Sequence, residues 1–313
     1  MKIAFVFPGQ GSQAVGMLGS LASEPAVADV LARAGRALGE DLAKLMLEGP
    51  ADALNLTVNT QPAMLTAGYA TFVAWRAAGG ALPAVVAGHS LGEYTALTAA
   101  GALTLEHAVP LVRFRAQAMQ DAMPVGAGAM AAILGLGDDD VRAACAESAR
   151  DQVVEAVNFN APSQVVIAGH AEAVQRACDA AKARGAKRAV LLPVSAPFHS
   201  SLLAPAAERL AQHLRNVPMA VPSIDVINNI DVAIERGPDQ IRAALARQAA
   251  GPVRWADTIR AMAAQGVTHV VECGPGRVLA GLTKRIAPTL ESLAIADATS
   301  LHETLSRVRG ETP

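Results

Sequence analysis

The residues with the clearest chemical potential in this sequence form the pattern G-x-S-x-G, as Gly88-His89-Ser90-Leu91-Gly92. Four apolar residues precede the pattern and a stretch of helical length follows, so a strand is expected to turn into a helix at Ser90. The two glycines allow a sharp turn, and the helix N-terminus aims backbone N–H groups at any oxyanion formed there. The pattern predicts a nucleophilic serine. The alternative is a glycine-rich turn whose serine only caps the helix.

A serine nucleophile needs a base, because its hydroxyl is barely acidic at neutral pH. Among seven histidines, His199 lies on a proline-constrained loop where two predicted domains meet, which favours it as the base. His89 adjoins the serine, but adjacent side chains in such a turn point apart. The other five are expected to be structural or solvated, since they fall in predicted helices, in a buried strand or in the polar C-terminal segment.

Composition limits the classes of protein to which the chain can belong. Its 313 residues suit two domains, and 52% hydrophobic against 17% charged residues are enough to fill a large core. The 26 basic and 28 acidic residues nearly cancel, so the chain lacks the net positive charge that would attract a nucleic-acid backbone. No nucleic-acid partner is therefore expected.

Three isolated cysteines, Cys145, Cys178 and Cys273, contain no CxxC pair. They predict neither a disulfide framework nor a zinc site, and no metal is expected. The apolar N-terminal run of seven residues is too short for a signal peptide or a membrane span. We therefore expect a cytoplasmic protein with no membrane partner.

Short β-branched runs alternate with Ala- and Leu-rich stretches of helical length, which favours an α/β fold with a mostly parallel sheet. Its strands are expected at 3–7, 84–87, 224–228 and 269–272, and its helices at 26–38, 61–78, 91–100, 104–123, 201–214, 240–248, 255–265 and 278–286.

A different order, β-α-β-β-α-β, is expected in the middle of the chain. Its strands fall at 130–136, 153–159, 165–168 and 188–194, with helices at 138–149 and 171–184. This order is typical of a ferredoxin-like module. We therefore expect a discontinuous core domain, 1–124 and 196–313, with a ferredoxin-like insert at 125–195 and a cleft between them.

The chain resembles the malonyl-CoA:acyl carrier protein transacylases of bacterial fatty acid synthesis almost from end to end. The motifs that carry the resemblance are 7–13, 59–63, 88–94, Arg115 with Met119-Gln120, 158–160, 195–199, Gln248 ahead of 252–255, and 272–276. The family's fold is an α/β-hydrolase-like core with a ferredoxin-like insert, which agrees with the element order above.

The resemblance implies a ping-pong transfer of malonyl from malonyl-CoA to the phosphopantetheine thiol of acyl carrier protein. Ser90 would be acylated and His199 would move the proton, while a backbone carbonyl at Gln248 orients the histidine. No acidic third residue is required, and no metal or redox cofactor is implied.

The resemblance also implies a set of substrate-binding residues. Arg115 would hold the malonyl carboxylate through two parallel hydrogen bonds. Arg113 lies about 200° away on an ideal helix, so only one of the two can face the site. The backbone N–H groups of Gln10 and Leu91 would form the oxyanion hole. Asn160 would also bind substrate, and Phe198 would exclude branched extender groups.

Several alternatives stay open at this stage. The same chemistry could serve a polyketide or malonate decarboxylase pathway. A serine hydrolase or thioesterase acting on acidic acyl thioesters, or a non-catalytic acyl-CoA-binding scaffold, would come from another functional class. Lys187-Arg188 and Lys284-Arg285 are candidate contacts for an acidic carrier protein, with solvated element ends as the alternative. A monomer is expected from the family.

Overall fold

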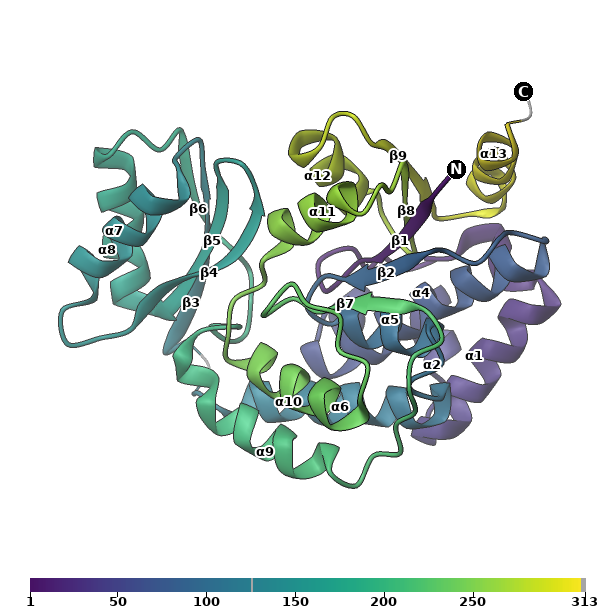
Figure 1. Ribbon diagram of the computed structural model, residues 1–313. Coiled ribbons are helices and arrows are strands. Elements are labelled where there is room, and N and C mark those ends of the chain that lie inside the picture. Colours follow the sequence, from purple (N-terminus) through teal and green to yellow (C-terminus); the bar gives the residue numbers. More distant parts are fainter. Residues whose placement is uncertain (125, 311–313) are drawn as a thin grey trace.

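The computed structural model describes residues 1–124 and 126–310 and contains two separate sheets (Figure 1). The larger sheet is wholly parallel, with the strand order β7-β2-β1-β8-β9. Its strands are β1 (Ile3–Phe7), β2 (Val85–Gly88), β7 (Asp225–Ile227), β8 (His269–Cys273) and β9 (Glu291–Ile295). The predicted α/β class with a mostly parallel core sheet is confirmed.

The central strand β1 shows why this sheet forms the core. All five of its residues are buried, as expected for an apolar run covered by helices on both faces. Phe5 and Phe7 point to one face, where their rings pack edge-on against Phe72. Ala4 and Val6 point to the other face and pack in a second apolar cluster with Trp255.

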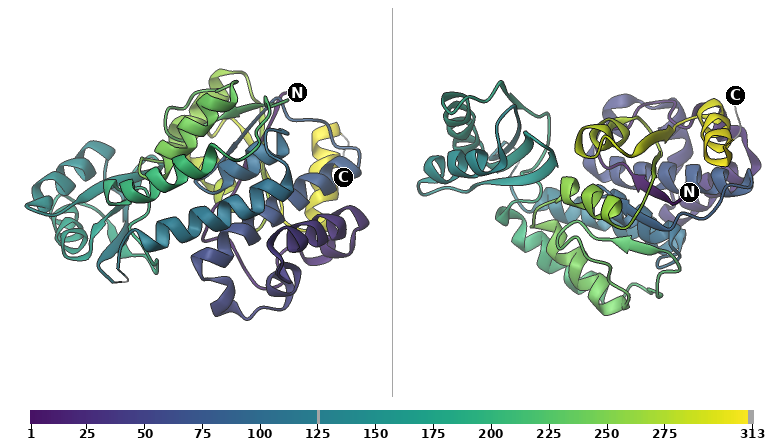
Figure 2. Two further views of the ribbon diagram at one scale, coloured as in Figure 1. Left: turned by 90° about the horizontal axis from the view of Figure 1, so that it is seen from below. Right: turned by 45° about the horizontal axis from the view of Figure 1, so that its top comes forward.

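Helices cover both faces of this sheet, as Figures 1 and 2 show. They are α1 (Pro25–Leu38), α2 (Leu42–Glu48), α3 (Ala51–Leu54), α4 (Thr57–Ala77), α5 (Gly92–Ala99), α6 (Leu105–Asp121), α9 (Ala204–Leu214), α10 (Pro238–Ala249), α11 (Trp255–Ala264), α12 (Val278–Ile286) and α13 (Ala298–Arg309), with 3-10 turns η1 (Gly19–Ser23) and η2 (Ser201–Leu203). Thr104 caps α6, because its hydroxyl accepts a hydrogen bond from the His107 backbone N–H. None of the helices in the described residues is long and apolar enough to cross a membrane.

The second sheet is antiparallel, with the order β4-β5-β3-β6, and projects from the rest of the molecule (Figures 1 and 2). It consists of β3 (Gly128–Leu134), β4 (Val154–Ala161), β5 (Gln164–His170) and β6 (Arg188–Leu191), with α7 (Asp138–Ala149) and α8 (Ala171–Ala183). This is the β-α-β-β-α-β order predicted from the sequence. All of it lies within the expected insert, whose first residue, 125, falls outside the described residues.

The end of the chain contains structure that the sequence did not predict. β9 is an edge strand whose residues are mostly half-buried, so its short run lacks the continuous apolar signal of β1. The polar segment after it forms α13, which starts with a capping box between Asp297 and Ser300. Residues 311–313 of the expected polar tail lie outside the described residues.

Backbone hydrogen bonds join the antiparallel sheet to the segment before α11. The Phe159 N–H on β4 donates to the Val253 carbonyl at 2.9 Å, and the Val253 N–H donates to the Val157 carbonyl at 2.8 Å. Arg285 on α12 adds side-chain contacts to Gln164 and to the Pro162 carbonyl on the hairpin between β4 and β5. The antiparallel sheet is therefore fixed against the core beside the segment that leads into α11.

Candidate active site

Ser90 lies on a sharp turn between β2 and α5, as the G-x-S-x-G pattern predicts. Its φ of 52° is in the left-handed region, which an ordinary side chain adopts only under strain. A Cβ on Gly88 would lie 1.8 Å from the Gly92 carbonyl carbon, and one on Gly92 would lie 2.1 Å from the Phe7 carbonyl oxygen. Both flanking positions therefore require glycine, and the turn has the strained strand-to-helix geometry that a nucleophile elbow needs.

His199 reaches this serine from the loop between β6 and α9. Its Nε2 lies 2.7 Å from Ser90 Oγ, and its Nδ1 lies 2.9 Å from the backbone carbonyl oxygen of Gln248. A carbonyl only accepts, so Nδ1 carries the proton and Nε2 is left to accept the serine proton. The arrangement is a Ser-His pair oriented by a main-chain oxygen, without a carboxylate in the third position.

The environment of His199 keeps its imidazole neutral. Only 4% of the residue is exposed, and this burial lowers its pKa to about 3; the positive charge of Arg115 acts in the same direction. At neutral pH the ring is therefore free to accept a proton from Ser90.

Arg115 on α6 is buried at 1% exposure beside the serine. Its Nη2 donates to Ser90 Oγ at 3.1 Å and to Gln248 Oε1 at 3.0 Å, and its Nη1 donates to Gln61 Oε1 at 2.8 Å. All three acceptors are neutral oxygens, so this guanidinium can still gain an anionic partner. Arg113 points the other way and pairs with Glu40 near the surface, as the helical spacing predicts.

A pocket opens in front of these groups and runs between the two sheets. Gln10 and Leu91 lie on its wall, and within the described residues neither of their backbone N–H groups donates a hydrogen bond. Two free donors beside the serine suit a developing oxyanion. The lining consists of Gln10, Gln61, His89, Ser90, Leu91, Arg115, Met119, Met130, Asn158, Leu192, Val194, Phe198 and His199.

A chain of hydroxyl and amide groups connects the Gln10 loop to the His199 loop. Gln10 Nε2 donates to Thr57 Oγ1 at 3.2 Å, and Thr57 Oγ1 lies 3.1 Å from Ser195 Oγ. Thr57 is 4% exposed at the start of α4. This side chain therefore ties a proposed oxyanion donor to the segment that carries the base.

The remaining predicted site residues divide into two groups. Phe198 lies on the pocket wall immediately before His199. Asn160 does not line the pocket. Its Oδ1 lies 2.8 Å from His89 Nε2, so Asn160 holds the imidazole ring of His89, the residue that precedes Ser90. Asn158 lines the pocket instead, and its buried Oδ1 has no hydrogen-bond partner among the described residues.

Asn229, which sequence reasoning missed, supports the elbow from the loop after β7. Its Oδ1 accepts from the Ser90 N–H at 2.7 Å, and its Nδ2 donates to the Gly88 carbonyl at 2.7 Å. Asn229 follows directly after the predicted strand 224–228 of the parallel sheet. The carboxyl end of such a strand often carries site residues, and this position was the signal available in the sequence.

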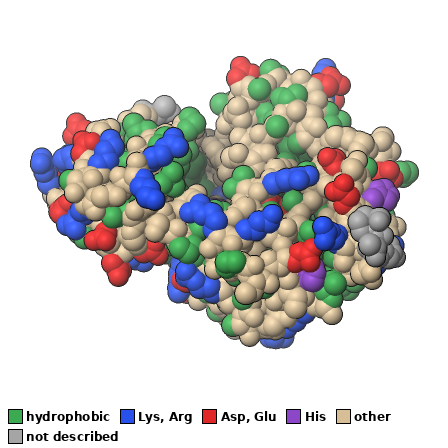
Figure 3. All heavy atoms as spheres, turned by 90° about the horizontal axis from the view of Figure 1, so that it is seen from above, with side chains coloured by type: hydrophobic (Ala, Val, Ile, Leu, Met, Phe, Trp, Pro, Cys, Tyr) green, Lys and Arg blue, Asp and Glu red, His purple; other side chains and the backbone are tan. Residues whose placement is uncertain are grey.

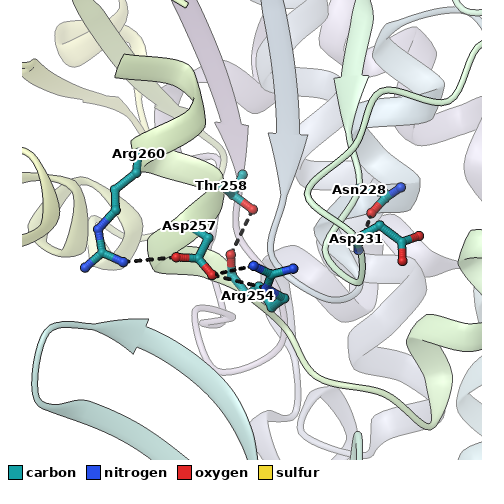
Figure 4. A network of polar contacts seen from close by, with 6 residues as sticks. All are labelled: Asn228, Asp231, Arg254, Asp257, Thr258 and Arg260. Carbon is teal, nitrogen blue, oxygen red and sulfur yellow. Dashed lines mark hydrogen bonds and ion pairs between the residues drawn. The ribbon is translucent and has the colours of Figure 1, made fainter. Parts of the chain in front are cut away.

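The Asn229 loop is held in turn by its neighbours, of which Figure 4 labels Asn228, Asp231, Arg254 and Asp257. Asn228 Oδ1 accepts from the Asp231 N–H at 2.8 Å, and the Arg254 N–H donates to the Asn229 carbonyl at 3.1 Å. The Arg254 side chain is itself fixed by Asp257 in the first turn of α11. The described residues contain no group of three or more His, Cys, Asp or Glu side chains that could hold a metal ion.

Comparison with known proteins agrees with this geometry. The family model for the acyl transferase domain matches residues 4–305. The malonyl CoA-acyl carrier protein transacylase of Escherichia coli K12 is 53% identical over 301 residues, covering 96% of this chain and 97% of that protein; its counterpart from Bacillus subtilis is 40% identical over 312 residues, covering 99% and 98%.

Solved structures show the same similarity. The crystal structure of an acyl-carrier-protein S-malonyltransferase from Burkholderia pseudomallei 1710b has a TM-score of 0.96 at 62% identity, covering 98% of this chain and 100% of that one. A malonyl-transacylase solved in complex with a type II polyketide acyl-carrier protein has a TM-score of 0.97 at 49% identity, again covering 98% and 100%. The chain therefore belongs to the acyl transferase domain family.

Proposed function

We propose that this protein transfers the malonyl group from malonyl-CoA to the phosphopantetheine thiol of acyl carrier protein through a malonyl ester on Ser90. The observation that carries the proposal is Arg115, a buried cation with three neutral acceptors placed at the nucleophile itself. A guanidinium in this position favours an acyl group that ends in a carboxylate. The names of the relatives give malonyl as that group and acyl carrier protein as the acceptor.

The first half-reaction forms the ester. His199 Nε2 accepts the proton as Ser90 Oγ attacks the thioester carbonyl, and the N–H groups of Gln10 and Leu91 donate to the developing oxyanion. The C–S bond then breaks, and the imidazolium returns its proton to the sulfur of CoA. In the second half-reaction the carrier thiol passes its proton to His199 Nε2 and attacks the ester carbonyl. The bond to Ser90 Oγ then breaks, and the imidazolium returns the proton to that oxygen, which frees Ser90. Neither half-reaction needs a metal or redox cofactor.

A hydrolase acting on the same acidic thioesters is the second candidate, because water could replace the carrier thiol. Intact-protein mass spectrometry with malonyl-CoA, followed by holo acyl carrier protein, distinguishes the two. We expect one malonyl adduct on the wild type, none on Ser90→Ala, and discharge of the adduct onto the carrier thiol. Equally fast decay without carrier would identify a hydrolase. An adduct that persists on Ser90→Ala would refute the proposed nucleophile.

We place carrier docking on the face around the pocket. Figure 3 shows Lys and Arg side chains on both lobes beside the hollow between them. Lys187 and Arg188 on one lobe, and Lys284 and Arg285 on the other, are exposed cations that suit an acidic carrier. Residues 125–195 form the inserted unit in this proposal. A cytoplasmic, monomeric enzyme of fatty acid synthesis is the corresponding prediction, with polyketide or malonate decarboxylase pathways as the alternatives.

A further inference from the structure

We infer that Glu93, on the first turn of α5, is a positioning residue of the transfer reaction: one of its carboxyl oxygens holds Asn229 and Gln248, the two residues whose side chains fix Ser90 and Arg115. The inference rests on the proposed function for the roles of Ser90 and Arg115. Glu93 is 2% exposed and does not line the pocket, so it acts through its neighbours rather than on the acyl group.

The first link runs through Asn229 to the nucleophile. Glu93 Oε2 accepts from the Asn229 backbone N–H at 2.8 Å. The side chain of Asn229 holds the elbow at two points, the Ser90 N–H and the Gly88 carbonyl. Removing the oxygen at Glu93 would therefore free the loop that sets the direction of the nucleophile.

The second link runs through Gln248 to the arginine. The same Glu93 oxygen accepts from Gln248 Nε2 at 3.0 Å, and that nitrogen also donates to the Ser90 carbonyl at 2.9 Å. The other end of the carboxamide, Oε1, accepts from Arg115 Nη2 at 3.0 Å. An acceptor at Glu93 thus forces the nitrogen of Gln248 toward itself and the oxygen toward the guanidinium. A flipped carboxamide would turn its NH₂ group against the cation.

The acceptor oxygen, rather than the negative charge, performs this task. Burial raises the pKa of Glu93 to about 7. The hydrogen bonds from Gln248 and Asn229 and the positive charge of Arg115 act in the opposite direction but are outweighed. Both protonation states are therefore populated near neutral pH, and either state leaves Oε2 able to accept. A buried carboxyl is costly where an apolar side chain of the same size would fill the space. Its two supporting links to the site account for its presence.

A matched pair of variants separates this role from a purely structural one. Glu93→Gln keeps an oxygen that can accept both bonds, whereas Glu93→Met keeps the volume without an acceptor. The readout is the single-turnover rate constant for acylation of Ser90 by malonyl-CoA and, separately, by acetyl-CoA. We expect Glu93→Gln to stay within about fivefold of the wild type, since hydrogen bonds to neutral acceptors are only modestly weaker.

For Glu93→Met we expect malonyl acylation slower by on the order of 100-fold, as for a small misplacement of reacting groups. Acylation of Ser90 by acetyl-CoA should slow less, because the acetyl group has no carboxylate for Arg115 to hold. Loss of folded protein alone would lower the fraction of sites acylated and leave the rate constant of the remaining sites unchanged. Wild-type rates in Glu93→Met, or equal losses in both variants, would overturn the inference.

A second variant covers the possibility that Glu93→Met does not fold. Gln248→Met breaks the same link from its other end and leaves the backbone carbonyl that orients His199. It should slow malonyl acylation more than acetyl acylation, and full malonyl activity would contradict the inference. Failure of the proposed function gives a different result, because Ser90→Ala would then still be labelled or the wild type would not be labelled at all.

Discussion

Arg115 Nη2 donates a hydrogen bond to Ser90 Oγ at 3.1 Å, so the group proposed to hold the acyl carboxylate touches the nucleophile. This contact places a fixed positive charge beside the hydroxyl whose proton must leave, and the same charge contributes to the low pKa of His199. Selection of the acyl group and activation of the serine are therefore connected through one side chain.

Replacing this arginine should change acyl selectivity as well as rate. For Arg115→Ala we expect kcat/KM for malonyl-CoA to fall roughly 30- to 5,000-fold. This range corresponds to a loss of about 2 to 5 kcal/mol of transition-state stabilisation, as for truncating one side of a buried charge pair. The acetyl group of acetyl-CoA carries no carboxylate for Arg115 to hold, so its kcat/KM should fall less. Steady-state kinetics with both thioesters test this, and equal losses for both would contradict the assignment of Arg115.

The acylation rate should be insensitive to mild acid. The low pKa of His199 keeps its imidazole unprotonated as the pH falls through 6.5, the ordinary value for histidine. Single-turnover acylation should therefore change by no more than about twofold between pH 7.5 and pH 5. A base with the ordinary pKa would lose about 30-fold over this range.

The control for this pH profile is Glu93→Gln, which removes the nearby buried carboxyl that titrates near pH 7. It should show the same flat profile, because Glu93 is assigned a role as an acceptor in both protonation states. A drop in rate centred near pH 6.5 in both proteins would show that His199 titrates as an ordinary histidine.

Removing the hydroxyl of Thr57 should lower the turnover rate more than it weakens substrate binding. Thr57→Val keeps the shape of the side chain but removes the hydroxyl between Gln10 and Ser195. We expect kcat to fall by about tenfold, the value of one or two hydrogen bonds, with little change in the KM for malonyl-CoA. Thr57→Ser retains the hydroxyl and should be close to the wild type. A fully active Thr57→Val would show that the two loops keep their positions without this bridge.

The elbow should not tolerate a methyl group. A Cβ on Gly92 would meet the carbonyl oxygen of Phe7, a backbone atom in the central strand, so the strand itself would have to move. Gly92→Ala is expected to lower the free energy of unfolding by about 3 kcal/mol or more. The matched control is Gly281→Ala on α12, where the added Cβ meets no atom within 4 Å and a gain of about 0.5 to 1 kcal/mol is expected. Urea unfolding of both variants provides the comparison, and equal stabilities would refute the steric argument.

Local features explain which parts could be predicted from the sequence. Ser90 was identifiable because the strand, the two glycines and the helix that make an elbow are adjacent in the chain. Central elements such as β1 were equally clear, since burial on both faces leaves a continuous apolar run. The half-buried β9 and the polar α13 lack that signal, because each meets the core along one side only.

The supporting residues of the site depend on contacts between distant parts of the chain. Glu93 and Asn229 are 136 positions apart, and Thr57 and Ser195 are 138 apart. The sequence position of an isolated glutamate or threonine does not indicate a hydrogen-bond partner so far away in the chain. The role of His199 required both its place at the domain junction and the family resemblance, since its partner at Nδ1 is a main-chain oxygen that any residue could supply.

The backbone pairing between β4 and Val253 has a consequence for how the molecule opens. Two main-chain hydrogen bonds and the contacts of Arg285 join the antiparallel sheet to the core, and the residues that follow Val253 lead into the helix beside the Asn229 loop. Amide protons of Phe159 and Val253 should therefore exchange with solvent only in large, cooperative openings. The lobe that carries the antiparallel sheet would then keep a fixed position relative to the core and would not move to open and close the pocket. Acyl thioesters would enter and leave between fixed surfaces.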